Sequence, residues 1–240
     1  MGEATAPHDG EPHQHGRLAG RLNWLRAGIL GANDGIISTA GIVVGVAGAT
    51  TERDWLLLTG LAGLVAGAFS MAGGEYTSVS AQRDTERAAL AQERWELEHL
   101  PGEELAELAG IYEQKGLSPE LAALVARELT AEDALAAHAE AELGIDADEQ
   151  TSPWQAAISS FVAFALGAAL PLLAIVLPPA TARVPVTMVT VVVALALTGY
   201  VGARLGGGRR SRAAARAVVV GLLTMAVTYA VGSAVGVSVS

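Results

Sequence analysis

Residues 55–100 read WLLLTGLAGLVAGAFSMAGGEYTSVSAQRDTERAALAQERWELEHL. The first half of this stretch is apolar and long enough to cross a bilayer, because a spanning helix needs about 20 predominantly apolar residues. The second half is strongly charged, and the sequence has neither Gly nor Pro between Glu75 and Leu100. Since Gly and Pro are the residues that most readily interrupt a helix, the pattern predicts a single helix that leaves the membrane and continues into water.

The composition of the whole chain points to the same class of protein. Of its 240 residues, 51% are hydrophobic and only 17% are charged, and the mean hydropathy is +0.39. Soluble domains typically contain about 25% charged residues. We therefore predict an all-α membrane protein with five transmembrane helices, over residues 24–49, 55–78, 154–177, 184–205 and 213–237.

The charged residues are concentrated between the second and third spans. Residues 81–152 contain 18 acidic and five basic residues, a net charge of −13, whereas the rest of the chain has a net charge of +3. Turn residues divide this acidic segment into short helices, which we expect at about 103–114, from Ser118-Pro119 onward, and from Thr130 onward. The predicted domains are a disordered tail (1–22), membrane helices one and two (23–80), an acidic helical insert (81–152) and membrane helices three to five (153–240).

The arginines predict the orientation in the membrane, because cytoplasmic loops near spans are enriched in Lys and Arg. Three arginines lie in residues 17–26, before the first span, and five lie in residues 204–216, around the loop between the fourth and fifth spans. The opposite side has only Arg53 and Arg183. We expect a multi-pass protein of a prokaryotic-type plasma membrane, with the N-terminus and the insert in the cytoplasm and the C-terminus outside.

Two classes of function are disfavoured by composition. The chain has no cysteine, so it cannot form a disulfide, a thiolate metal site or a cysteine nucleophile. Its acidic balance disfavours nucleic acid as a partner, because nucleic-acid affinity depends on Lys and Arg facing phosphates.

Two carboxylates lie inside predicted spans. Asp34 is near the middle of the first span and Glu75 is near the cytoplasmic end of the second, with Met71 four residues before it on the same helix face. A charge at membrane depth costs about 2.5–3.5 kcal/mol even on the lenient insertion scale. The spans contain no base placed to neutralise Asp34, so a cation or proton is the expected counter-charge. The alternative is that Asp34 stays protonated, or caps a helix that unwinds at the turn-prone residues 33–35.

A second group of acids lies in the insert. Glu93 and Glu96 share one helix face, Glu104 and Glu107 share another, and a Pro-Gly turn at 101–102 can fold the two faces together. His138 and Glu142, at i and i+4, add a nitrogen and a further oxygen. Carboxylates with an imidazole suit Mn²⁺, Fe²⁺, Co²⁺ or Zn²⁺. The alternative is that these acids form ordinary solvated helix faces.

Several motifs together resemble those of the vacuolar iron transporter family of divalent-metal/proton exchangers. They are Asn33-Asp34-Gly35, the segment SMAGGEY at 70–76, Leu-Pro-x-x-Glu-x-x-Glu at 100–107 and Glu142-Leu143-Gly144. The resemblance extends from about residue 22 to the C-terminus, and the family's plan is likewise five spans with the insert between the second and third.

The resemblance implies roles for particular residues. Asp34 would be a ligand in the translocation path with Met71 beside it, and five glutamates would form a cytoplasmic metal-binding domain: Glu93, Glu96, Glu104, Glu107 and Glu142. The family works as a homodimer with the path at its interface, where four small residues would permit close helix contact: Gly31, Gly35, Gly41 and Gly45. The alternative for these glycines is packing within one protomer. Plant-like members carry further acids where this chain has Ala27 and Gly63, and Glu75 would substitute for that charge.

The leading hypothesis is therefore a transporter, not an enzyme, that moves Fe²⁺ or Mn²⁺ out of the cytoplasm in exchange for protons. It would need no cofactor beyond the transported ion, with Co²⁺ and Zn²⁺ as further candidates. One alternative is a membrane-anchored di-iron ferroxidase, but such sites need a Glu-x-x-His from each of two helices, and only Glu96–His99 fits. The other is a metal-sensing membrane protein in which the acids are merely solvated.

Overall fold

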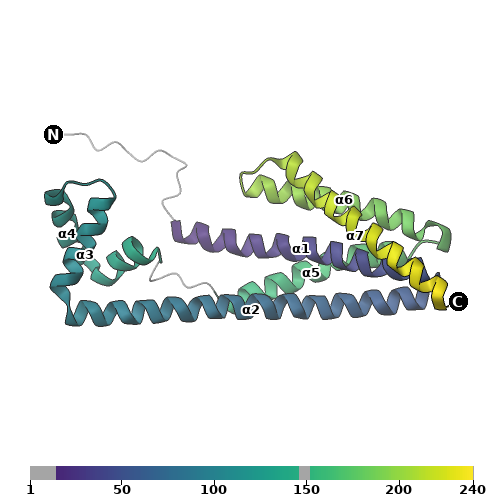
Figure 1. Cartoon of the computed structure of the whole chain (residues 1–240), viewed down its shortest axis with the longest axis horizontal. Coiled ribbons are helices and arrows are strands. Elements are labelled where there is room, and N and C mark those ends of the chain that lie inside the picture. Colours follow the sequence, from purple (N-terminus) through teal and green to yellow (C-terminus); the bar gives the residue numbers. More distant parts are fainter. Residues whose placement is uncertain (1–14, 146–151, 240) are drawn as a thin grey trace. The chain divides into compact units, whose positions relative to one another are not determined.

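A computed structural model describes residues 15–145 and 152–239, and every element in those ranges is helical (Figure 1). The helices are α1 (His15–Ala49), α2 (Arg53–His99), α3 (Pro101–Gln114), α4 (Pro119–His138), the π-helical turn η1 (Ala139–Leu143), α5 (Pro153–Val176), the 3-10 turn η2 (Ala180–Ala182), α6 (Arg183–Leu205) and α7 (Arg210–Val239). They form two compact units. The membrane unit comprises Leu22–Thr77 and Pro153–Ser240, and the second unit contains the insert, Ser78–Ser152.

The five predicted spans are confirmed. Among the residues that the structure describes, five helices are long and apolar enough to cross a membrane: Gly28–Ala49, Arg53–His99, Pro153–Val176, Ala180–Leu205 and Arg210–Gly236. Helix α1 begins at His15, earlier than the predicted end of the disordered tail at residue 22, because residues 17–22 are mostly Arg, Leu and Ala, which favour helix. The rest of that tail, residues 1–14, lies outside the described residues.

The four small residues of α1 contact other helices of the same chain. A side chain at Gly35 would collide with the backbone carbonyl of Phe164 on α5, and one at Gly31 would come within 3.0 Å of the Ser160 carbonyl on that helix. Gly41 and Gly45 face Thr224 and Thr228 of α7 in the same way. Absence of side chains here lets helix backbones approach closely. The structure thus shows packing within one protomer at these glycines, the alternative to the dimer contact implied by the resemblance.

Replacing Gly35 by Ala is therefore expected to destabilise the membrane unit. The new Cβ meets backbone, which cannot rotate away as a side chain can, so we expect a loss of about 1–3 kcal/mol. Thermal unfolding in detergent measures this as a lower melting temperature. Gly73→Ala on α2 is the control, because a Cβ there meets nothing within 4 Å of it. An unchanged melting temperature in the Gly35 variant would contradict this packing.

The insert follows the predicted order of helices with one correction. Helix α2 runs without a break to His99, α3 begins at Pro101, and Ser118 caps α4 by accepting a hydrogen bond from the Leu121 amide at 3.4 Å. The further helix was predicted to start at Thr130, but α4 continues through that residue and the new segment starts three residues later. The break comes at Asp133, whose backbone leaves the helical region (φ −157°, ψ 99°).

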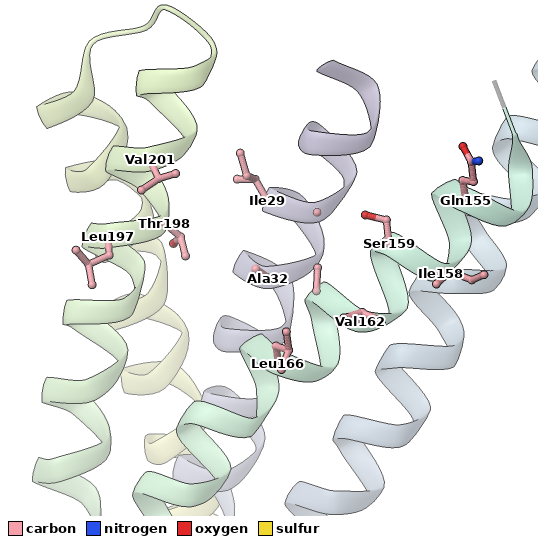
Figure 2. Close-up of a pocket in the computed structure, with 12 residues that line it drawn as sticks. Ile29, Ala32, Gln155, Ile158, Ser159, Val162, Leu166, Leu197, Thr198 and Val201 are labelled. Atoms are coloured by element: carbon pink, nitrogen blue, oxygen red, sulfur yellow. The ribbon is translucent and has the colours of Figure 1, made fainter. Parts of the chain in front are cut away.

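A groove of about 690 Å³ lies between α1, α5 and α6 in the membrane unit. Figure 2 shows Ile29 and Ala32 of α1 between the facing side chains of α5 and α6. The lining is apolar apart from Gln155, Ser159 and Thr198, and it includes no ionisable side chain.

Candidate metal centre

The predicted path residues lie on two helices of the membrane unit. Helix α1 is continuous through residues 33–35, so the local unwinding considered for this turn-prone segment is not seen. The side chain of Asp34 is exposed, while Met71 and Glu75 on α2 are half-buried. Within the described residues, no hydrogen bond or ion pair joins Asp34 to Glu75. Their shared role in transport stays a prediction.

The neighbour of Asp34 makes a contact that the sequence did not predict. The side-chain oxygen of Asn33 accepts a hydrogen bond from the Thr198 hydroxyl of α6. Inside a membrane-spanning unit, such a polar link between helices replaces water that the lipid cannot supply. It fixes the rotation of α1 relative to α6, and therefore the direction in which Asp34 projects. The polar pair Asn33-Asp34 inside an apolar span indicates some polar contact, but the partner, Thr198, is too distant in sequence to be predicted from the local pattern.

The insert brings four of its predicted ligands together. Glu93 lies on α2 and Glu104 lies in the first turn of α3, where the helix N-terminus favours negative charge. His138 is the last residue of α4, and Glu142 follows in η1. Each ligand comes from a different element, and the predicted fold at Pro101-Gly102 is what brings Glu93 and Glu104 near each other.

The imidazole of His138 is at the centre of this cluster. Its Nδ1 lies 2.9 Å from Glu93 Oε1, 3.6 Å from Glu104 Oε2 and 3.7 Å from Glu142 Oε2. His138 is fully buried, and Glu93 and Glu104 are 2% and 5% exposed. Ionised carboxylates are almost never this buried unless they are paired. We call these four residues the insert cluster.

Two local distortions of the helix aim His138 at the carboxylates. After the kink at Asp133, the Asp133 side chain accepts a hydrogen bond from the Ala136 amide at 3.0 Å and so caps a new helical segment. The π-helical turn at 139–143 follows, and Gly144 ends it with a φ of +63°. Single π-helical turns are frequent at functional sites. Asp133 is thus a positioning residue that the sequence analysis missed, although an Asp at this point is a recognisable cap.

The polar atoms of the cluster are not satisfied by the protein. Both ring nitrogens of His138 and Oε1 of Glu93 are buried without a hydrogen-bond partner among the described residues. No Lys or Arg in the described part of the chain forms an ion pair with these carboxylates, and the basic group within 4 Å of them is the His138 imidazole, which is charged only when protonated. Unsatisfied buried acceptors of like charge repel one another, and a cation between them removes both problems.

The spacing of the ligand atoms fits a small transition-metal ion. Metal–ligand bonds of about 2.0–2.2 Å in a tetrahedral site place neighbouring ligand atoms about 3.3–3.6 Å apart. One ligand atom each from Glu93, Glu104 and His138 lies within 4.8 Å of the others. The distances from His138 Nδ1 to the three carboxylates, 2.9, 3.6 and 3.7 Å, lie on either side of this tetrahedral spacing. The cluster can therefore coordinate an ion after small side-chain movements.

Glu96 and Glu107, the other two predicted insert ligands, remain outside this contact. The amide of Gln92 donates to Glu96 at 3.1 Å, and Glu107 is exposed. They still act through their charge. Burial, together with the nearby carboxylates of Glu142, Glu104, Glu96 and Glu107, raises the pKa of Glu93 to about 7. Burial also raises the pKa of Glu104, while His138 lowers it.

These shifts predict an unusual dependence of stability on pH. The ordinary glutamate pKa is 4.5, so between about pH 5 and pH 7 the folded protein retains a proton on Glu93 that the unfolded chain has released. The free energy of unfolding attributable to Glu93 therefore falls as pH rises through this window, and it levels off above it. We expect the metal-free protein to melt at a higher temperature at pH 5.5 than at pH 8, relative to Glu93→Gln.

Thermal unfolding in detergent with a chelator measures this difference. Subtracting the Glu93→Gln profile removes the acids that titrate normally elsewhere in the chain. The exposed Glu98 on the same helix supplies the control, because Glu98→Gln should leave the profile of the native chain unchanged. A Glu93→Gln profile that runs parallel to the native one would contradict the raised pKa.

The histidine of the only Glu-x-x-His pair is engaged elsewhere. His99 is exposed and stacks on Trp95 with ring centroids 4.6 Å apart, and its Nδ1 is 2.7 Å from the Trp95 carbonyl. It contributes nothing to the insert cluster. The described residues therefore do not form the paired Glu-x-x-His arrangement of a di-iron oxidation site.

The fold and the cluster define a class: a multi-pass helical membrane protein with a buried carboxylate–imidazole centre in a polar insert. The chain belongs to the VIT family, whose model matches residues 25–233. It is 44% identical over 226 residues to a vacuolar iron transporter of Acanthamoeba castellanii, covering 93% of this chain and 82% of that protein. It is 38% identical over 212 residues to vacuolar iron transporter homolog 1 of Oryza sativa subsp. japonica, covering 88% and 73%. To vacuolar iron transporter homolog 2.1 of Arabidopsis thaliana it is 35% identical over 217 residues, covering 90% and 83%.

These comparisons confirm the family that the motifs indicated and support iron or metal transport across a membrane as the function. They agree with a transporter rather than an enzyme.

Proposed function

We propose that this protein exports Fe²⁺, and also Mn²⁺ or another divalent transition metal, from the cytoplasm in exchange for protons. The observation that carries the proposal is the insert cluster, in which the buried carboxylates of Glu93 and Glu104 and the exposed carboxylate of Glu142 surround a buried imidazole. No Lys or Arg of the described residues forms an ion pair with these carboxylates. Such a site concentrates divalent cations from dilute solution. We propose that captured ions then bind Met71 and Glu75, which lie on the same helix, α2, in the membrane unit.

Within the membrane unit, we propose that Asp34, Met71 and Glu75 hold the partly dehydrated ion. An acid that projects from a spanning helix without a base needs either a proton or a cation, and exchange of one for the other couples their movements. Protonation from the outer side would weaken metal binding and release the ion. The proposed orientation places the insert in the cytoplasm and the C-terminus outside, in a plasma membrane.

The transporting unit is proposed to be a homodimer. Asp34 is exposed in the single chain, and a charged side chain facing lipid is strongly disfavoured. A second copy that covers this face of α1 would provide a polar path for it. The glycines of α1 do not support this contact, because they already face α5 and α7.

Proteoliposomes containing a pH-sensitive dye test the proposal. Addition of Fe²⁺ or Mn²⁺ outside should make the lumen more alkaline as metal enters and protons leave, in proportion to the amount of protein. Liposomes without protein control for leakage, and added Mg²⁺ controls for a general effect of divalent ions. Metal uptake without proton movement would overturn the exchange mechanism, and no uptake of any transition metal would overturn transport.

A further inference from the structure

His138 is the one nitrogen donor of the insert cluster. Nδ1 faces the carboxylates of Glu93, Glu104 and Glu142, all within 3.7 Å, and Nε2 has no hydrogen-bond partner in the described part of the chain. A structural histidine in a protein core normally satisfies at least one nitrogen by a hydrogen bond. This imidazole is completely buried, so bulk solvent does not reach it. Its burial therefore has a cost that hydrogen bonding within the fold does not offset.

A proton on Nδ1 does not by itself explain the arrangement. Although Glu93 Oε1 is only 2.9 Å away, the approach does not have the geometry of a hydrogen bond, and Oε1 is also left without a partner. A neutral imidazole would instead direct its lone pair at three anions, which is repulsive. An ion bound between the nitrogen and the oxygens removes the repulsion and satisfies the orphaned atoms together.

We infer that His138 is a metal ligand that sets the ion preference of the insert cluster, favouring Co²⁺ and Zn²⁺ over Mn²⁺ and disfavouring Mg²⁺ and Ca²⁺. This inference rests on the proposed function of the cluster in metal capture. Mg²⁺, Ca²⁺ and Mn²⁺ prefer carboxylate, carbonyl and water oxygen, whereas imidazole suits Zn²⁺, Fe²⁺ and the later metals. An imidazole nitrogen among carboxylate oxygens therefore increases the differences in affinity between these metal ions, and the affinity for Fe²⁺ is expected to lie between those for Mn²⁺ and Co²⁺.

The histidines of the chain allow a matched experiment. There are five: His8, His13, His15, His99 and His138. Replacing the first three by Gln gives a background in which His99 and His138 remain. His99→Gln in this background is the control for His138→Gln, because His99 lies in the same insert but is exposed and stacked on Trp95. All variants are prepared as the full chain in detergent and compared by thermal unfolding.

The first readout is pulsed EPR of one equivalent of bound Mn²⁺, which detects the ¹⁴N nucleus of a coordinated imidazole. We expect nitrogen coupling in the background and in His99→Gln, and its loss in His138→Gln. The second readout is affinity by titration calorimetry. Loss of His138 should weaken Co²⁺ and Zn²⁺ binding by about 10- to 100-fold and Mn²⁺ binding much less, so that the ratio of Co²⁺ to Mn²⁺ affinity falls.

Different results overturn different conclusions. If Mn²⁺ binds to the background without nitrogen coupling, or if coupling persists in His138→Gln, the inference is wrong and capture by the glutamates alone still stands. If all metals weaken equally in His138→Gln, the histidine does not set the preference. If nitrogen coupling depends on His138 but proteoliposomes show no transport, the inference holds and the proposed function fails.

Discussion

Asp34→Asn is expected to abolish metal-driven proton movement in proteoliposomes while leaving the insert cluster able to bind metal. Asn has almost the same shape as Asp and can keep the local packing of α1, but it has no charge to exchange between proton and cation. If the carboxylate supplies the counter-charge at membrane depth, its loss leaves the ion uncompensated at a depth where an unpaired charge costs about 2.5–3.5 kcal/mol. We expect transport to fall by at least about tenfold, with Co²⁺ binding to the insert unchanged.

The control removes a carboxylate close in sequence but outside the predicted path. Glu52 is exposed between α1 and α2, so Glu52→Gln makes the same change in charge and should transport normally. Thermal unfolding must show that the Asp34 variant is folded, and a dye assay with an ionophore must show that its liposomes are sealed. Normal transport by Asp34→Asn would exclude this residue as the coupling group.

Much of the fold could be predicted because membrane spans leave a strong local signal. A run of about 20 apolar residues is rare outside helices that cross a bilayer, and the charged half of α2 still has no Gly or Pro to end the helix before Leu100. The start of α4 was also recognisable, because Ser118 is a good N-cap and Pro119 suits the first position of a helix. The position of the break at Asp133 was not, because Thr130 and Asp133 are both residues that cap helices and lie three positions apart.

The insert cluster could be predicted in part. Pairs at i and i+3 share a face only approximately, because three residues advance a helix about 60° short of a full turn. Glu93 and Glu104 contact His138, whereas Glu96 and Glu107 do not and act on Glu93 through their charge. The central position of His138 depends on the kink at Asp133 and the π-helical turn at 139–143. Neither feature follows from residue spacing.

The double variant Glu93→Gln, Glu104→Gln is expected to lose metal binding by the insert cluster and at the same time to stabilise the metal-free protein above pH 7. Removing two of its three carboxylate ligands takes away most of the charge that attracts the ion, and we expect the affinity for Co²⁺ to fall by at least about 100-fold. The gain in stability has the same origin. Burial and the neighbouring carboxylates raise the pKa of both Glu93 and Glu104, which means that the fold disfavours their ionised forms, whereas neutral amides cost less free energy to bury.

Lower metal affinity together with higher stability in this double variant would distinguish a metal-binding site from an ion-pair network that stabilises the fold. If His138⁺ paired with these glutamates mainly to hold the insert together, replacing both would destabilise the protein, because a buried charge would lose its partners. Calorimetry gives the affinity, and thermal unfolding with a chelator at pH 8 gives the stability. The Asp34→Asn background restricts calorimetry to the insert.

The matched control is Glu98→Gln, Glu103→Gln, which removes the same charge from the same two helices. Both of these side chains are exposed, so the control variant should keep full Co²⁺ affinity and nearly the same melting temperature. A general electrostatic attraction of the acidic insert would weaken both double variants alike. A loss of Co²⁺ affinity confined to the Glu93 and Glu104 variant, together with a higher melting temperature of that variant without metal, would have one physical meaning. The fold would then hold these carboxylates together at the expense of its own stability, as expected of a site that binds a cation.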